Sequence, residues 1–489
     1  MIELEIWADS FHEGEWCCNQ LGTIVCQNGG THQVVYKNGF IPVHTIQTPD
    51  FNLVLTVYGS YKSWSPIPKE ISALLSWGKP DFIAYDAKAK KILFAVEETA
   101  AVPTGNQALQ RCERIFGSAR KKIPFWYLLS EFGQHKDGGI RRDSIWPTIM
   151  ALKLTYVNKT PCVVLHYSDS ENPENYTAGK GLKSLFTSLF KIISNYVTGK
   201  SILHDMSSSL KDQYQSMLEF VHSQWQEIID FLPGEENLLS DSSKIAQLYA
   251  DAAEGKPTVL PENFLVWPKV IELPEQVAEK LKEKELIKDD ILCRLLERDV
   301  GQGKGYCLSD NAGSKPQTKA SIISWVKEQK ELFYAAPALT PPAKFDIDIS
   351  DFPVTKNGNY HVTTSKNIVY LYDRWHDLRQ TIEEAYPRLH GKLPSTRDED
   401  SVLMYISNSI TPGRIFGDPY TGQLSAFATI FGKLDHPPRM VVAYFPHQSH
   451  TQALPGKRKN KGLTLMSELT DLLIFTGGVA ISLQTGEVY

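Results

Sequence analysis

The sequence is poor in cysteine and has no long apolar run. Seven cysteines in 489 residues are sparse and odd in number, and none has the C-x-x-C spacing of a zinc site. We therefore expect reduced thiols in a cytoplasmic protein, without a disulfide framework or a structural zinc. No window has the roughly 18 uninterrupted apolar residues that a membrane helix needs, and the first residues are acidic where a signal peptide is basic. We expect no membrane partner.

Signatures of nucleotide-dependent enzymes are also lacking. No glycine-rich fingerprint follows a predicted strand, and there is no helicase or methyltransferase motif. Gly301–Tyr306 has the glycines and the lysine of a phosphate loop. It has no Ser or Thr after Lys304, however, and it follows a predicted helix where a phosphate loop follows a strand. We expect no nucleotide cofactor, and a chain that neither modifies nor translocates its substrate.

What is present is the composition of a folded protein with several domains. The chain is 42% hydrophobic, 11% aromatic and 22% charged, with a formal net charge of −5. Its length exceeds that of one ordinary core, so two or three domains are expected. The small net charge neither requires nor excludes a nucleic-acid partner, because a basic groove can lie on an acidic body.

The apolar pattern of the first 200 residues predicts an α/β core with a mixed sheet. Short apolar runs between turn signals indicate strands, and apolar residues at intervals of three and four indicate helices. The predicted strands are 23–27, 32–38, 51–59, 82–85, 92–96, 125–129 and 161–167, and the predicted helices are 69–75, 106–121 and 145–158. Strands alternating with helices are typical of this fold class.

The character changes after residue 180. Helices are predicted at 181–197, 209–231, 241–253, 272–300 and 318–333, and the clearest linker is 336–342. Beyond the linker we expect strands near 367–373 and 439–446 and helices near 374–386 and 462–475. The sequence thus predicts a domain at 1–200, a helical domain at 201–335 and an α+β domain at 343–489.

The segment from Pro80 to Arg114 carries the strongest functional signal. It reads as a hairpin whose second strand is almost wholly apolar and ends at Glu97 and Glu98, with Asp81 at the start of the first strand. Carboxylates at the end of a buried strand are costly unless they are compensated, and a divalent cation is a common compensation. The alternative is a solvated strand end next to a turn.

This arrangement resembles the PD-(D/E)xK nuclease superfamily, to which the type II restriction endonucleases belong. The resemblance covers residues 65–130 and implies a restriction-endonuclease-like mixed sheet flanked by helices. It implies that Asp81 and Glu97 hold Mg²⁺, for which Mn²⁺ could substitute. Thr99 stands where the family has a lysine, so the lysine's role would move to the next helix, where the candidates are Gln107, Gln110, Arg111 and Arg114.

Two further carboxylates follow from the same resemblance. Glu98 could replace Glu97 as the ligand if the strand is bulged, and Glu70 matches an additional acidic residue that is frequent on the preceding helix of the family. Gln107 and Arg111 would orient the phosphate or the attacking water. Asp398–Asp400, a second acidic cluster, is expected to be a loop or a helix start.

The expected activity is Mg²⁺-dependent, site-specific cleavage of double-stranded DNA, as in antiviral restriction systems. Basic residues expected to contact nucleic acid are Arg114, Lys121, Arg141, Arg142, Lys457, Arg458 and Lys459. One candidate centre per chain implies a homodimer or sequential nicking. Two alternatives stay open: an antiphage nuclease effector without a defined site, and a catalytically inactive nuclease fold that only binds DNA.

Overall fold

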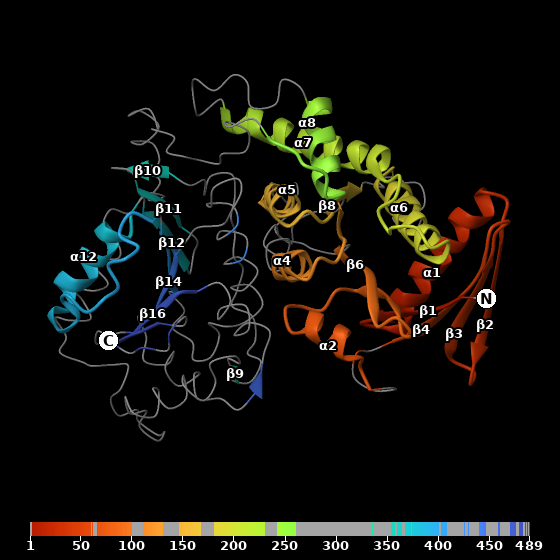
Figure 1. Cartoon of the computed structure of the whole chain (residues 1–489), viewed down its shortest axis with the longest axis horizontal. Helices are drawn as coiled ribbons and strands as arrows, with labels where there is room; N and C mark the ends of the chain where they lie inside the picture. The colour runs from red at the N-terminus through yellow and green to blue at the C-terminus, as the bar shows by residue number, and fades with distance from the viewer. Residues whose placement is uncertain are drawn as a thin grey trace, which may run out of the picture. The chain divides into compact units, whose positions relative to one another are not determined.

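The structure is a computed structural model in which two compact units are described. It describes residues 2–59, 61, 66–99, 111–130, 146–167, 180–229 and 242–260, then 374–400 and short segments between 334 and 489. The first unit holds Met1–Thr104, Arg114–Trp225 and Asn237–Phe264, and the second holds Gly105–Glu113, Gln226–Glu236 and Leu265–Tyr489 (Figure 1). No helix among the described residues is long and apolar enough to cross a membrane.

An eight-stranded mixed sheet forms the core of the first unit, in the order β2-β3-β4-β1-β5-β6-β7-β8. Its strands are β1 (Ile2–Ala8), β2 (Thr31–Lys37), β3 (Ile41–Gln47), β4 (Asn52–Tyr58), β5 (Phe82–Asp86), β6 (Lys91–Thr99), β7 (Phe125–Ser130) and β8 (Cys162–Tyr167). β1 pairs with β4, and β6 with β7 and β7 with β8, in parallel, while the other pairs are antiparallel. The α/β class with a mixed sheet is confirmed.

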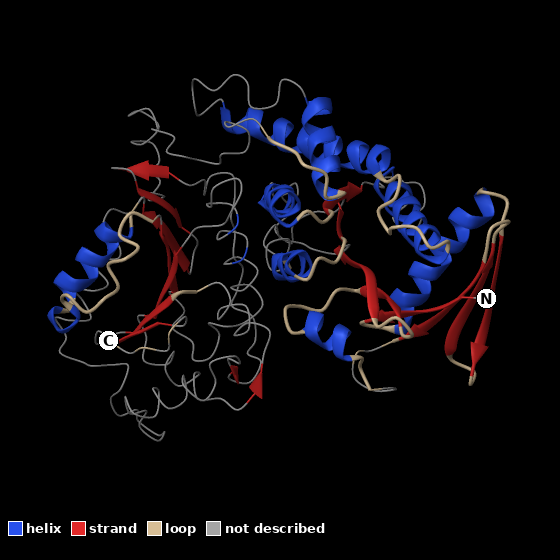
Figure 2. Cartoon of the chain, viewed as in Figure 1, coloured by secondary structure: helices blue, strands red, loops and turns tan. Residues whose placement is uncertain are grey.

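Helices cover both faces of this sheet (Figures 1 and 2). One face carries α1 (Phe11–Gln27) and α6 (Lys180–Val197). The other carries α2 (Lys69–Leu75), α4 (Cys112–Arg120) and α5 (Trp146–Asn158). Both outer layers bury apolar side chains against the strands, so the predicted hairpin becomes the central pair β5 and β6, buried on both faces.

Helix α1 replaces a predicted strand. We expected residues 23–27 to be extended because they are rich in β-branched side chains, but they form the last turns of α1. The helix starts with a capping box, in which Ser10 Oγ accepts from the Glu13 N–H at 3.2 Å and Glu13 Oε2 accepts from the Ser10 N–H at 2.9 Å. Its buried residues, Cys17, Cys18, Leu21, Ile24 and Val25, share one helical face.

The first unit extends beyond the predicted boundary at residue 200. Its additional helices are α7 (Ser207–Ile229) and α8 (Ser242–Ala253). Trp126 Nε1 on β7 donates to Gln213 Oε1 on α7 at 3.0 Å. Tyr214 on α7 lies 3.1 Å from the Thr155 hydroxyl of α5. These buried bonds make α7 part of the first core, so residues 201–260 do not form a separate helical domain.

The second unit contains a seven-stranded mixed sheet in the order β10-β11-β12-β13-β14-β16-β17. Its strands are β10 (Val354–Lys356), β11 (Asn359–Thr363), β12 (Asn367–Tyr372), β13 (Val402–Ser407), β14 (Met440–Phe445), β16 (Leu472–Phe475) and β17 (Val479–Ser482), with helix α12 (Trp375–Ala385) after β12. A separate ribbon pairs β9 (Tyr334–Ala335) with β15 (Arg458–Lys459). The predicted helix 462–475 is wrong over β16. The predicted segments 272–300, 318–333 and 336–342 lie outside the described residues.

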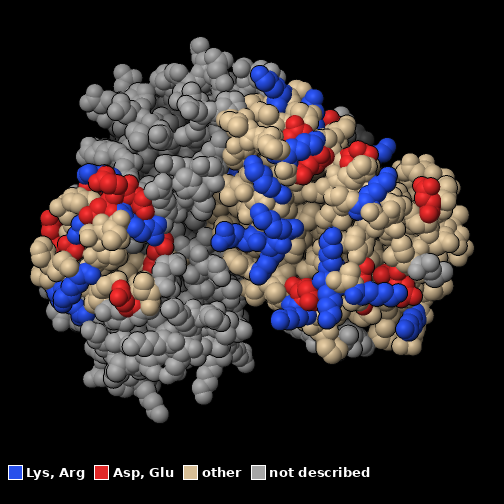
Figure 3. All heavy atoms as spheres, in the orientation of Figure 1, with Lys and Arg blue, Asp and Glu red and all other residues tan. Residues whose placement is uncertain are grey.

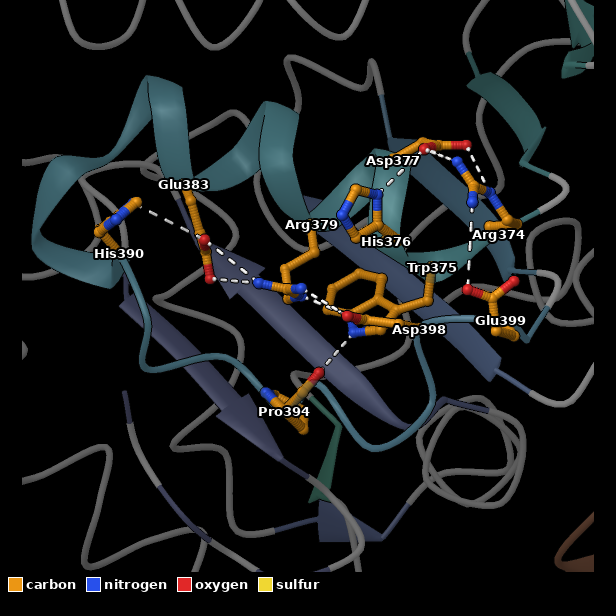
Figure 4. Close-up of polar contacts among 10 residues, drawn as sticks. All are labelled: Arg374, Trp375, His376, Asp377, Arg379, Glu383, His390, Pro394, Asp398 and Glu399. Atoms are coloured by element: carbon orange, nitrogen blue, oxygen red, sulfur yellow. Dashed lines mark hydrogen bonds and ion pairs between the residues drawn. The ribbon is translucent and has the colours of Figure 1, made fainter.

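The acidic cluster Asp398–Asp400 is a loop that holds the start of α12 (Figure 4). The carbonyls of Asp398 and Asp400 accept from the backbone N–H groups of His376 and Trp375, at 3.0 and 2.7 Å. The Asp398 carboxylate binds Arg379 through two bonds, of 3.0 and 2.6 Å. The cluster precedes strand β13, so of the two expectations, a loop or a helix start, the loop is confirmed.

Candidate functional site

The start of β5 and the end of β6 bring two predicted carboxylates together. The antiparallel register pairs Phe82 with Val96, and its next position places Asp81 opposite Glu97. Directly opposite residues project from the same face of a sheet with Cβ atoms about 5 Å apart. The Asp81 carboxylate accepts from the backbone N–H of Glu98, which fixes it against the end of β6.

Two further acids, which the sequence did not single out, border this pair. Asp9 follows β1, and its N–H donates to the Asp81 carbonyl at 3.0 Å, which continues the β1–β5 register by one residue. Three neighbouring strands, β1, β5 and β6, thus carry a carboxylate on one face at the same edge of the sheet: Asp9, Asp81 and Glu97, which we call the acidic row. Glu13 lies in the first turn of α1, where burial raises its pKa and the charges of Asp9 and Glu97 add to that rise.

Tyr61 is the buried residue next to this acidic row. Its hydroxyl donates to the Pro80 carbonyl at 2.7 Å and thus holds the residue that precedes Asp81. Burial raises the pKa of this hydroxyl well above its ordinary value, and the charges of Asp81, Asp9 and Glu97 add to the rise. Tyr61 is therefore a neutral donor at neutral pH.

Arg114 on α4 forms an ion pair with Glu97. The Glu97 side chain is 0% exposed and that of Arg114 is 12% exposed, so the pair is shielded from water. The guanidinium compensates the buried carboxylate that the sequence analysis assigned to a metal ion. Contact between Arg114 and a phosphate, as predicted from the sequence, would require this pair to open.

The other two predicted ligands, Glu98 and Glu70, do not join this pair. Glu98 faces away from Glu97, because the ladder is regular at this end of β6 and its irregularity lies between Ala84 and Tyr85. Glu70 on α2 accepts from the Tyr85 hydroxyl at 2.9 Å. Tyr85 is four residues from Asp81, which is about 13 Å along an extended strand. The predicted role of Glu70 as a ligand of the same metal does not fit this placement.

Of the two predicted nucleic-acid contacts in the described part of the first unit, Arg114 belongs to this site and Lys121 does not. Lys121 follows the last residue of α4, whereas Arg111 precedes its first residue and Arg114 lies in its first turn. Arg458 and Lys459 form β15 of the second unit. Outside the described residues lie Gln107, Gln110, Arg141, Arg142 and Lys457. Thr99 ends β6 in register with Leu129 of β7.

No protein-family model, curated protein or solved structure matches this chain. The site must therefore be interpreted from its own chemistry. Within the described part of the chain, no group of three or more Asp, Glu, His or Cys side chains is arranged to hold a metal ion. Mg²⁺ is commonly bound by only one or two carboxylates together with waters and substrate phosphates, and Asp81 and Glu97 provide such a pair.

One sequence pattern marks the position of Asp9 and Glu13, which were not predicted as site residues. Ser10 and Glu13 have the spacing of a capping box, which marks a helix start and hence the end of a strand at the preceding residues. That pattern places Asp9 at a strand end. The proximity of Asp9 to Asp81 depends on the pairing of β1 with β5, and Tyr61 reaches Pro80 from a loop. Neither contact has a local sequence signature.

Proposed function

We propose that this chain is a Mg²⁺-dependent endonuclease of double-stranded DNA, with its centre where β5 begins and β6 ends. The observation that supports this proposal is the placement of Asp81 opposite Glu97 on one face of a buried strand pair. Glu97 is fully buried, which argues against the alternative of a solvated strand end. A buried carboxylate is retained at a cost to stability, and function is a common reason for retaining it.

Asp81 and Glu97 would hold the metal ion, and Mn²⁺ could replace Mg²⁺. When bound, such an ion supplies a Lewis acid for the phosphate and lowers the pKa of a coordinated water. Asp81 is oriented by the Glu98 N–H and, through Pro80, by Tyr61. Opening of the Glu97 pair would free the Arg114 guanidinium to donate to phosphate oxygens near the same place.

A second candidate is a nuclease fold that binds DNA without cutting it. The ion pair between Arg114 and Glu97 favours it, because the guanidinium already occupies the charge that a metal would neutralise. Thr99 at the position of the family's lysine favours it too. The two candidates share the fold. They differ in whether Glu97 can leave Arg114 and bind a metal ion instead.

The deciding experiment is incubation of the purified full chain with supercoiled plasmid in Mg²⁺, in Mn²⁺ and in a chelator. We expect nicked or linear product with either metal and none in the chelator. Asp81→Ala and Glu97→Gln should abolish the product but retain DNA binding. Asp212→Asn, which removes an exposed carboxylate on α7, is the matched control and should cut like the wild type. Cleavage that survives in Asp81→Ala would refute the site.

The same digest, repeated on phage DNA, separates two kinds of nuclease. Discrete fragments indicate site-specific restriction, and a smear indicates an effector without a defined site. Gel shifts without any product in either metal indicate the binding module. Because each chain has one candidate centre, linear product without accumulated nicked circle would further indicate a homodimer.

A further inference from the structure

The edge of the first sheet opposite the acidic row is strongly basic. Its exposed Lys and Arg residues come from the β5–β6 turn, the ends of α4 and α5, and the segment after α6. They are Lys88, Lys90, Lys91, Arg120, Lys121, Lys122, Lys159 and Lys200, which we call the basic edge. Figure 3 shows Lys and Arg side chains gathered where Figure 1 shows the ends of α4 and α5.

Three of these lysines adopt a backbone conformation that lysine avoids. Lys90, Lys122 and Lys159 have φ values of 54°, 59° and 51°, in the left-handed region. Five non-glycine residues have positive φ in the described part of the chain, and three are the lysines of this one edge. The left-handed region favours glycine and, to a lesser degree, asparagine. Strained residues that a fold retains are candidates for function.

The helix ends of this protein provide an internal comparison. After α6 and α8, Gly199 and Gly255 occupy the left-handed position, with φ of 74° and 80°. After α4 the same motif is made by Lys122, whose N–H donates to Ala119 while the Ile123 N–H donates to Ser118. Lysine thus stands in the left-handed position after α4 and α5, where the chain has glycine after α6 and α8.

The cations of this edge also oppose one another. The pKa of Lys159 is lowered by partial burial and by the charge of Lys122. Within the described residues, no member of the basic edge forms an ion pair with a carboxylate. Lys122 Nζ donates to the Asn158 carbonyl, and the Lys159 ammonium lies over the Tyr156 ring. These contacts do not neutralise the two charges, whereas a bound polyanion would.

We propose that the basic edge binds the phosphodiester backbone of a nucleic-acid segment that does not enter the candidate site. The lysines come from turns at successive strands, which lie about 4.8 Å apart, and so form a row that suits a linear polyanion. Lys91 and Glu97 stand at opposite ends of β6, about 20 Å apart in an extended strand. The choice of DNA rests on the proposed function, but binding here needs neither metal nor cleavage.

The test replaces the three lysines in the left-handed conformation by glycine, which adopts that conformation without strain. In the triple variant Lys90→Gly, Lys122→Gly and Lys159→Gly, glycine suits each left-handed position, so Tm should be unchanged or higher. Binding of a fluorescein-labelled duplex in chelator should weaken about tenfold or more, with a salt slope smaller by roughly 3. The matched control, Lys37→Gln, Lys183→Gln and Lys211→Gln, removes the same charge elsewhere and should bind like the wild type.

Three results would overturn the proposal. One is unchanged duplex affinity and salt slope in the glycine variant, and another is an equal loss in the control. The third is loss of binding to phosphatidylserine vesicles with duplex binding intact, which would identify a membrane surface instead. Asp81→Ala is expected to leave duplex binding in chelator unchanged. The cleavage assay therefore tests the nuclease proposal, and the binding assay tests the basic edge independently of it.

Discussion

Arg114 on α4 and Glu97 on β6 form an ion pair in which the carboxylate is fully buried. The pair joins the helix to the central strand, and the guanidinium neutralises the Glu97 charge in the candidate site. Removing one partner of a buried pair leaves an uncompensated charge, which costs more than replacing both partners.

Arg114→Met should therefore lower the free energy of unfolding by about 3 kcal/mol, measured by urea denaturation. The double variant Arg114→Met and Glu97→Gln should recover most of this loss, because no buried charge remains. Arg120→Met, an exposed arginine on the same helix, is the control and should change stability by less than about 0.5 kcal/mol. If the single and double variants are equally unstable, the charge is not the cause.

Gly22 on α1 packs against the His32 ring. A Cβ added at Gly22 would lie 2.2 Å from His32 Nδ1, and the ring is held by its bond to His44 at 2.9 Å. Glycine to alanine in a helix usually stabilises by up to about 1 kcal/mol. Here Gly22→Ala should instead destabilise by about 1–3 kcal/mol in urea denaturation, because the site is overpacked.

Adding His32→Ala to Gly22→Ala tests this reason. It vacates the space that the new methyl group needs, so the double variant should lose less than the sum of the two single variants. Simple additivity would show that the ring is not what the methyl group meets.

The sequence predicted the parts of the fold whose signals are local. β5 to β8 with α5 follow apolar runs and helical spacing, and all of them form as predicted. The prediction failed at residues 23–27, where β-branched side chains suggested a strand but burial against the sheet favours the last turns of α1. Intrinsic propensity is a weak preference that tertiary packing overrides.

The candidate site was predictable only in its central pair. Asp81 and Glu97 lie on two strands of one hairpin, so their proximity follows from a short segment of sequence. Asp9 and Tyr61 join them through pairings between distant segments. Lys121 lies seven residues after Arg114, about 10 Å along the helix axis and towards the opposite ends of the strands, so its predicted contact with nucleic acid would lie away from this site.

His44 predicts how stability depends on pH. It is 0% exposed, and burial together with the neighbouring His32 lowers its pKa to about 4. Between this value and about 6.5 the unfolded chain binds a proton that the folded chain does not. The contribution of His44 therefore falls as pH decreases from about 6.5 to 4, and it is constant above that window.

The measurement is the urea midpoint of the wild type and of His44→Asn at pH 7 and at pH 4.5. The wild type should lose more stability on acidification than the variant, because asparagine does not titrate. Carboxylates shared by both proteins cancel in the comparison. Parallel losses would show that His44 is protonated in the folded state at pH 4.5.

In the second unit, Arg379 should be irreplaceable by lysine. Its guanidinium makes two bonds to Asp398 and two to Glu383, the latter of 3.3 and 3.4 Å, and its side chain is 14% exposed. Lysine cannot reproduce this fork, so Arg379→Lys should destabilise the α12 region by about 1–2 kcal/mol. Because the Asp398 carbonyl accepts from the His376 N–H, hydrogen exchange at the start of α12 should accelerate correspondingly.

The matched control is Arg374→Lys, at the residue that precedes α12. Arg374 is 47% exposed and pairs with Asp377 at 2.9 Å, and exposed pairs of this kind contribute less than about 1 kcal/mol. Exchange at His376 should therefore change little in this variant. Equal acceleration in both variants would mean that any loss of an arginine charge loosens the helix start. A selective effect of Arg379→Lys would instead show that the fork to Asp398 holds the loop in place.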